Sequence, residues 1–255
     1  MKSTILSRLN EIEQTHHIVI LYACESGSRA WGFPSADSDY DVRFLYLRPV
    51  HWYLSVEEKR DVIEVPIDDQ LDITGWDLKK ALQLFRKSNP PLLEWLGSPV
   101  VYVEKHSVRS QLRELAKEHF SPQTCFLHYF GTARNHYREA TAGEGVKLKS
   151  YFYALRTLLA TLWIEAGNGV APTEFRALLE RMVTDSALKA EILSLLARKQ
   201  AGAEKDSNPR IPLISDFIEA EIARLETSPL QLESRAAPYE ILDGLFQKTL
   251  AEVWK

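Results

Sequence analysis

The spacing of apolar residues divides the chain into two parts. In residues 1 to about 105, short apolar runs rich in β-branched and aromatic residues alternate with turns, a pattern typical of strands. Beyond residue 107, apolar residues recur every three to four positions over long stretches, which indicates helices. The sequence therefore predicts an α+β protein, with a sheet-containing domain over residues 1–105 and an all-helical domain over residues 106–255.

The first part contains two predicted helices and four predicted strands. Apolar residues at helical spacing predict the N-terminal helix: Ile5, Leu6, Leu9 and Ile12. The predicted strands are HIVILYAC (17–24), DVRFLYLR (41–48), IDDQLDITGWD (67–77) and VVYV (100–103). The helix predicted over WDLKKALQLFRKS (76–88) ends at NPP (89–91), because a proline disfavours helical backbone in the residue before it.

The second part contains seven predicted helices separated by breaks that contain glycine or proline. The helices are predicted at residues 107–119, 121–140, 147–166, 173–182, 185–201, 212–226 and 238–254. The breaks are GEG (143–145), GNGVAP (167–172) and SNPRIP (207–212).

Composition and charge limit the classes of protein that the chain can represent. With 255 residues, 45% of them hydrophobic and 26% charged, it can bury one large core or two smaller ones. The opening residues carry frequent charges, and no later run is apolar for long enough to span a bilayer, so we expect a cytoplasmic protein without membrane contact. The two cysteines lack the spacing of a zinc site, and the net charge of −4 argues against broad, charge-driven nucleic-acid binding.

A glycine-serine pair after the first predicted strand indicates a phosphate-binding turn. Gly27 has no Cβ, so the backbone at this position can approach a phosphate closely. Ser28 opens a short predicted helix whose free N–H groups attract anionic oxygens, and Arg29 can add a positive charge beside them.

Carboxylates that follow this turn indicate a divalent-cation site. Asp39 and Asp41 are two residues apart on an extended segment, so their side chains emerge on the same face and can hold one cation. Mg²⁺ prefers such oxygen ligands, and Asp72 in the strand predicted over 67–77 is the preferred third carboxylate. Three other acidic residues nearby are alternatives for that third position: Asp68, Asp69 and Asp77. The alternative interpretation of Asp39 and Asp41 is a polar turn that enters a strand.

These elements together resemble a known family. The segment GSRAWGFPSADSDYDVRFLY (27–46) is similar to the signature of the DNA polymerase β superfamily of nucleotidyltransferases. More narrowly, four segments resemble the YcgL-like group of the RNA-repair-associated polymerase β family (RlaP): ESGSRAWG (25–32), SDYDVRFLY (38–46), LDITGWDLKKAL (71–82) and KSNPPLLEWLGSPVVY (87–102). The resemblance covers residues 20–105 closely, and KLKSYFYALR (147–156) less specifically.

The resemblance implies a small mixed β-sheet nucleotidyltransferase domain flanked by helices, and transfer of a nucleoside monophosphate from a nucleoside triphosphate with release of pyrophosphate. It implies two Mg²⁺ ions, with Mn²⁺ as an alternative, on Asp39, Asp41 and Asp72. Gly27 and Ser28 would hold the β and γ phosphates, and Asp72 would also help to deprotonate the attacking hydroxyl. The helical domain would close over the nucleotide and contribute to acceptor recognition.

The helix predicted over residues 147–166 adds three expected nucleotide-binding residues. Lys149 lies at its beginning, and Tyr153 and Arg156 are three residues apart, so one face of the helix can carry both toward a triphosphate. The alternative is a core helix with a solvated basic end. The family places a basic helix near this point, which favours the nucleotide-binding interpretation.

The acceptor stays open at this stage. The family resemblance suggests an RNA end, or tRNA, whereas the acidic net charge leaves room for a protein or a small-molecule acceptor. An antitoxin-like protein adenylyltransferase is one rival function, and a catalytically silent nucleotide-binding module is another. Three mutually repelling carboxylates argue against the silent module, because their proximity makes sense mainly for metal binding. Base preference, template use, oligomeric state and the arrangement of the C-terminal helices do not follow from the sequence.

Overall fold

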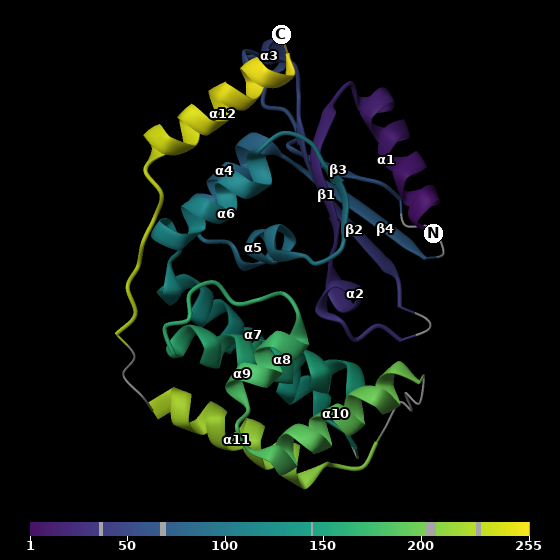
Figure 1. Cartoon of the computed structure of the whole chain (residues 1–255), viewed down its shortest axis with the longest axis vertical. Helices are drawn as coiled ribbons and strands as arrows, with labels where there is room; N and C mark the ends of the chain where they lie inside the picture. Colours follow the sequence, from purple (N-terminus) through teal and green to yellow (C-terminus); the bar gives the residue numbers. More distant parts are fainter. Residues whose placement is uncertain (36–37, 67–69, 144, 202–207, 228–230, 255) are drawn as a thin grey trace. The chain divides into compact units, whose positions relative to one another are not determined.

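The computed structural model describes residues 1–35, 38–66, 70–143, 145–201, 208–227 and 231–254 (Figure 1). It confirms the predicted α+β fold class, with a five-stranded mixed sheet and with helices before, between and after its strands along the chain. The chain forms two compact units. The sheet unit comprises Met1–Ala30, Asp39–Phe120 and Arg235–Lys255, and the helical unit comprises Trp31–Ser38 and Ser121–Ser234. The functional domain boundary at residue 105 stays a prediction.

The sheet has the strand order β3-β4-β2-β1-β5. Its strands are β1 (Val19–Glu25), β2 (Tyr40–Leu47), β3 (Val62–Glu64), β4 (Leu71–Asp77) and β5 (Val101–Glu104). β2 and β4 run parallel, while the other neighbouring pairs are antiparallel, so the sheet is mixed as the family resemblance implied. β3 was not predicted, because three residues are too few for alternation to be visible in the sequence.

One face of the sheet is covered by helix α1 (Lys2–His16). Ile5, Leu9 and Ile12 of this helix are buried, as their spacing predicted, whereas Leu6 is exposed. They join a hydrophobic core with alternate residues of β2, namely Val42, Phe44 and Tyr46. Because successive side chains of a strand point to opposite faces, Asp41 and Arg43 lie on the face away from α1.

The other helices of the sheet unit follow the strands in sequence. The first of them, α2 (Gly27–Trp31), begins two residues after the end of β1. The others are α3 (Val50–Tyr53), α4 (Leu78–Arg86), α5 (Pro90–Gly97), α6 (Val108–His119) and α12 (Tyr239–Val253). The NPP sequence that was predicted to end a helix also begins α5. The Asn89 side chain accepts a hydrogen bond from the Leu92 N–H, and Pro90 occupies the first turn, where a missing N–H has no cost.

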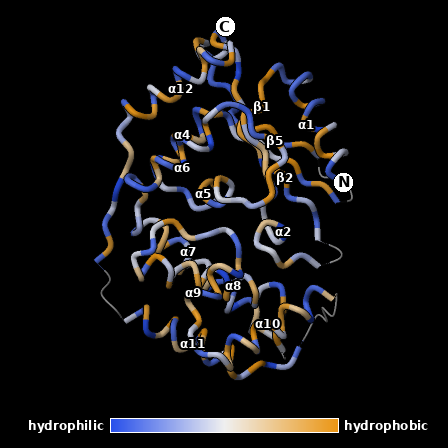
Figure 2. Tube along the Cα trace, in the orientation of Figure 1, coloured by the Kyte–Doolittle hydropathy of each residue, from blue (hydrophilic) through white to orange (hydrophobic). Residues whose placement is uncertain are grey.

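Helix α12 belongs to the sheet unit although it comes from the far end of the chain. Its Phe246 ring lies edge-on to Tyr53, with 5.0 Å between ring centroids, and the Arg86 guanidinium lies 4.2 Å from the Tyr239 ring centroid. Figure 2 shows that hydrophobic and hydrophilic residues are interspersed along α12 and α1. The buried residues of each helix recur every three to four positions, so each helix buries one side.

The helical unit contains the five remaining helices. They are α7 (Pro122–Ala140), α8 (Leu148–Glu165), α9 (Phe175–Met182), α10 (Ser186–Gln200) and α11 (Pro212–Thr227). All seven helices predicted beyond residue 107 are confirmed within two residues at each end. Helix α8 is buried on nearly all sides and forms the centre of this unit. Of the helices in the described ranges, none combines the length and apolar character that crossing a membrane requires.

Candidate functional site

The parallel pairing of β2 and β4 brings Asp41 and Asp72 together. The two residues are direct partners in the strand register, so their side chains leave the same face of the sheet from adjacent strands. About 30% of the Asp41 side chain and 28% of the Asp72 side chain is exposed. The two carboxylates are thus close to each other and still open to solvent, as a cation site requires.

Arg43 connects these two carboxylates. Its Nη2 donates to Asp41 Oδ1 at 3.2 Å and to Asp72 Oδ2 at 2.7 Å. Its Nη1 donates to the backbone oxygen of Asp72 at 3.0 Å and to that of Val42 at 3.1 Å. Arg43 was not among the site residues predicted from the sequence. Its spacing of two residues from Asp41 in a predicted strand was the available signal, because that spacing places both side chains on one face.

Gly27 forms the turn that faces Asp41. Its φ is +59°, a left-handed conformation that residues with a side chain rarely adopt. A Cβ at this position would lie 2.2 Å from Asp41 Oδ2, so the Asp41 carboxylate occupies the space that a side chain would need. The preceding residue also contacts Asp41, because the Ser26 N–H donates to the backbone oxygen of Asp41 at 2.8 Å. The glycine-serine turn is therefore built directly against the carboxylate.

Glu25 supports Asp41 from the buried side. Glu25 is 1% exposed, and its Oε1 accepts a hydrogen bond from the Asp41 N–H at 2.7 Å. The Tyr102 hydroxyl donates to the other carboxylate oxygen, Oε2. Burial raises the pKa of Glu25, and the hydrogen bonds from Tyr102 and Asp41 oppose that rise. These contacts fix the position of the Asp41 backbone next to the Gly27 turn. The sequence alone did not show this role.

Ser28 and Arg29 occupy the first turn of α2, as predicted. The Arg29 Nε donates to the backbone oxygen of Asp39 at 3.1 Å, and its guanidinium lies 3.7 Å from the Tyr40 ring centroid. Arg29 therefore links the turn at Gly27 and Ser28 to the segment that enters β2. Ser28 is partly exposed in that turn.

Asp39 lies one residue before β2. Within the described part of the chain, no three acidic, histidine or cysteine side chains lie close enough together to hold a metal ion. The structure thus brings together two of the three predicted carboxylates, Asp41 and Asp72. The carboxylate of Asp39 lies outside the paired strand, so strand geometry does not direct it toward the other two. Its role as a metal ligand stays a prediction.

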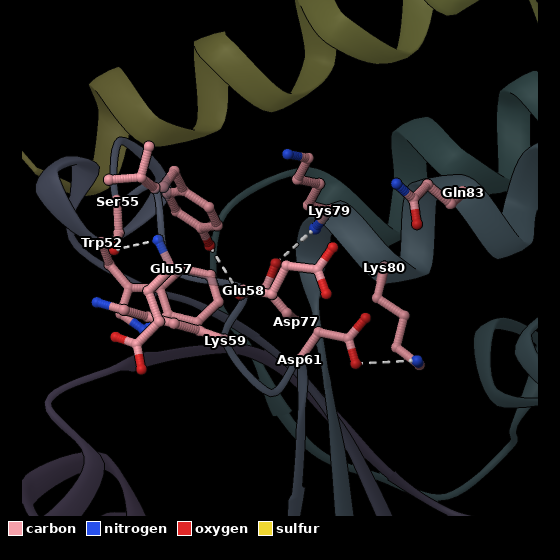
Figure 3. A pocket seen from close by; sticks show the side chains of 12 residues that line it. Trp52, Ser55, Glu57, Glu58, Lys59, Asp61, Asp77, Lys79, Lys80 and Gln83 are labelled. Carbon is pink, nitrogen blue, oxygen red and sulfur yellow. Dashed lines mark hydrogen bonds and ion pairs between the residues drawn. The ribbon is translucent and has the colours of Figure 1, made fainter.

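Asp77, one alternative for the third carboxylate, lies at the other end of β4 (Figure 3). It lies five positions after Asp72, which corresponds to roughly 17 Å along a strand. Its carboxylate caps α4 by accepting from the Lys79 N–H at 2.8 Å, and it accepts from the Tyr53 hydroxyl at 2.8 Å. It lines a separate cavity of about 290 Å³ beside the ion pair of Asp61 and Lys80.

The other two alternatives for the third carboxylate, Asp68 and Asp69, lie outside the described residues. Among the acidic residues proposed for this position and described by the structure, Asp72 is the one that faces Asp41.

The predicted nucleotide-binding residues of α8 lie in the helical unit. Lys149 is exposed in the first turn of the helix. The Tyr153 ring lies edge-on to Trp31, with 5.0 Å between ring centroids. Arg156 is 2% exposed, its Nη2 donates to the backbone oxygen of Thr173 at 3.2 Å, and its guanidinium lies 4.4 Å from the Trp31 ring centroid. The roles of these three residues in nucleotide binding stay predictions.

The chemistry of the donors fits a hard divalent cation. Mg²⁺ is usually held by one or two carboxylates together with substrate phosphates in octahedral geometry. One nitrogen atom of Arg43 already lies within hydrogen-bonding distance of both Asp41 and Asp72, so a single positive charge can contact both side chains at once. The carboxylate pair therefore suits Mg²⁺, and Mn²⁺ by the same ligand preference.

Comparison with known proteins agrees with the motifs and the fold. Residues 1–248 match the RNA repair pathway DNA polymerase beta family. The chain is also 48% identical to the uncharacterized protein YcgL of Bacillus subtilis (strain 168) over 256 residues, which cover 100% of this chain and 98% of that protein.

Among solved structures, a nucleotidyltransferase-like protein from Exiguobacterium sibiricum covers 86% of this chain and 75% of its own, with 13% sequence identity and a TM-score of 0.35. That similarity is too low to support a functional conclusion. The match over residues 1–248 and the identity to YcgL support the family resemblance seen in the motifs. The chain belongs to the RNA repair pathway DNA polymerase beta family, a family of polymerase β-like nucleotidyltransferases.

Proposed function

We propose that the protein is a Mg²⁺-dependent enzyme that transfers a nucleoside monophosphate from a nucleoside triphosphate to an acceptor hydroxyl, with release of pyrophosphate. One observation carries the proposal. Asp41 and Asp72 are register partners on adjacent parallel strands, and Asp41 lies directly beside the backbone of the Gly27 turn. In this arrangement the proposed cation site and the proposed phosphate-binding turn are neighbours, with the Asp41 side chain in contact with both.

The proposed reaction requires little covalent chemistry from the protein. The acceptor oxygen forms a bond to the α phosphorus while the bond to the bridging oxygen of the β phosphate breaks, and pyrophosphate leaves. Asp41 and Asp72 would hold the cation, which supplies positive charge to the phosphate oxygens and favours loss of the acceptor's proton. The backbone N–H groups at Gly27 and Ser28 would bind the β and γ phosphates. Asp72 would take up the proton of the attacking hydroxyl.

An RNA end is the proposed acceptor. The family to which the chain belongs is described by an RNA repair pathway, and this description supports RNA over other hydroxyl compounds. The net charge of −4 requires that RNA contacts be local, because neutralising many phosphates takes a basic surface. A tRNA end is one form of this acceptor, and a protein or a small molecule is the rival.

The test supplies each α-³²P-labelled triphosphate with Mg²⁺ or Mn²⁺, and offers RNA with a free 3′ hydroxyl in one reaction and a cell lysate in another. We expect label on RNA with the wild-type protein, and a rate lower by a factor of about 10³ with Asp41→Asn. The fold should survive this change, since a partly exposed ion pair contributes on the order of 1 kcal/mol or less.

Asp61→Asn is the matched control, because Asp61 belongs to the same unit and pairs with Lys80 in the separate cavity. It should retain the wild-type rate. Label on protein alone would replace RNA by a protein acceptor. Triphosphate binding without turnover would indicate a silent nucleotide-binding module. An Asp41→Asn variant with the wild-type rate would show that the metal assignment is wrong.

A further inference from the structure

The two site carboxylates carry like charges on adjacent strands and need a counter-charge in the absence of a metal ion. Their mutual repulsion is strong at this separation when no cation lies between them. Arg43, whose side chain is only 17% exposed, provides that positive charge through one nitrogen that contacts both Asp41 and Asp72. The site is therefore already neutralised in part by a residue of the chain.

The two terminal nitrogens of Arg43 have different kinds of partner. Nη1 donates to two backbone oxygens, those of Val42 and Asp72, which stay in place as long as the strands stay paired. Nη2 donates to the carboxylate oxygens of Asp41 and Asp72, the atoms that the proposed cation would use. A change in the Nη2 contacts would thus leave the guanidinium attached to the sheet through Nη1.

We propose that Arg43 is an internal counter-ion that competes with the divalent cation for Asp41 and Asp72, so that the cation binds weakly until a triphosphate supplies further ligands. The inference rests on the proposed function and concerns the regulation of that same site. Mg²⁺ gives up its water ligands reluctantly, and a competing guanidinium adds to that difficulty. The phosphate oxygens of the triphosphate add negative charge and metal ligands, so they favour binding of the metal ion over the contacts of Arg43.

Charge arithmetic gives the direction of the effect. With Arg43 in place, the two carboxylates and the guanidinium sum to one negative charge, whereas a neutral residue at position 43 would leave two. Loss of Arg43 should therefore raise the affinity for a divalent cation in the absence of nucleotide. An arginine that only orients the carboxylates would have the opposite effect, because its loss would disorder the ligands and weaken binding.

The experiment measures Mn²⁺ binding to the full-length protein by calorimetry, without nucleotide. The variants are Arg43→Met, Arg43→Gln, Arg43→Lys and the control Arg60→Met, which removes a charge that pairs with Glu64 elsewhere in the sheet unit. We expect Arg43→Met and Arg43→Gln to bind Mn²⁺ at least roughly tenfold more tightly than the wild type, the factor expected for loss of one charge-assisted contact. Arg43→Lys should lie between them and the wild type, and Arg60→Met should equal the wild type.

A second measurement, thermal unfolding with and without Mn²⁺, tests metal binding in variants whose stability is reduced. The rise in unfolding temperature on addition of Mn²⁺ should be larger for Arg43→Met and Arg43→Gln than for the wild type, because at a given concentration a ligand that binds the folded state more tightly stabilises it more. In each variant, the added substitution Asp41→Asn should abolish this rise.

The outcomes separate the inference from the proposed function. If Mn²⁺ binding depends on Asp41 but is no tighter without Arg43, the counter-ion inference is wrong and the metal site stands. If neither the wild type nor the Arg43 variants bind Mn²⁺ in a manner that depends on Asp41, both the metal site and the inference are wrong.

Discussion

Gly27 is subject to two separate constraints. Its positive φ of +59° disfavours any residue with a side chain, and its missing Cβ leaves the space that Asp41 Oδ2 approaches. Gly32 shares only the first constraint, because its φ is +87° and no atom lies within 4 Å of its ideal Cβ position. The pair therefore allows backbone strain and contact with the carboxylate to be tested apart.

We predict that Gly27→Ala and Gly32→Ala each lower the free energy of unfolding by about 1–2 kcal/mol, the cost of a left-handed residue with a Cβ. Only Gly27→Ala should also displace Asp41, and it should lower nucleotidyl transfer by a factor of about 10² or more. Urea unfolding and the transfer assay measure the two effects. Equal activities of the two variants would contradict a direct contact of Gly27 with the site.

Chemistry and local spacing were sufficient to select residues that the fold brings together. Gly27, Asp41 and Asp72 were chosen for their residue type and their place relative to predicted strands, and the structure places Asp41 beside each of the other two. Their roles in metal and phosphate binding stay predictions. Glu25 and Arg43 were not among the site residues predicted from the sequence. Their contacts with Asp41 cross between strands or run along one strand face, and such contacts depend on which strands are neighbours.

Helix α4 begins at a buried carboxylate, and this local feature predicts a pH effect. Asp77 is 1% exposed, and burial raises its pKa from 3.8 to about 6, despite hydrogen bonds from Tyr53 and Lys79 that act in the opposite direction. The folded protein therefore holds this proton more tightly than the unfolded chain does. Stability should fall as the pH rises from about 4 to about 6, and change no further from this group above that range.

We predict that Asp77→Asn removes this part of the pH dependence. Between pH 4 and pH 7, its stability relative to the wild type should increase by at most roughly 3 kcal/mol, the value of a pKa difference of this size. Asparagine also caps helices, so α4 should persist. Urea unfolding over this pH range tests the prediction, with Asp243→Asn, a change at an exposed position of α12, as the control that keeps the wild-type slope. A slope for Asp77→Asn that equals that of the wild type would contradict the assignment.

The sheet unit is assembled from three separate stretches of the chain. Its strands and α1, α4, α5 and α6 come from the first 120 residues, whereas α12 comes from Arg235–Lys255. Leu245 of α12 is 5% exposed, and Leu179 of α9 in the helical unit is fully buried. Truncation of either side chain creates a cavity in the unit that contains it.

We predict that Leu245→Ala and Leu179→Ala each destabilise their own unit by about 2–5 kcal/mol. Hydrogen exchange followed by mass spectrometry should show faster exchange in β2 and β4 for Leu245→Ala, and in α7 and α8 for Leu179→Ala. If both variants accelerate exchange equally throughout the chain, the two units unfold as one, and their separate stabilities are not measurable in this way.

Local patterns in the sequence were sufficient for the α+β class, for the helices beyond residue 107 and for the strands that carry Asp41 and Asp72, because helical and strand periodicity depend on neighbouring residues. They were also sufficient for the family, whose motifs are contiguous segments. Only the tertiary structure decided that β4 pairs in parallel with β2, that Asp41 faces Asp72 and that Arg43 lies between them. It also decided that α12 joins the sheet unit. Strand order, register and the docking of a distant helix arise from contacts between residues far apart in the chain, and single-sequence periodicity contains no information about such contacts.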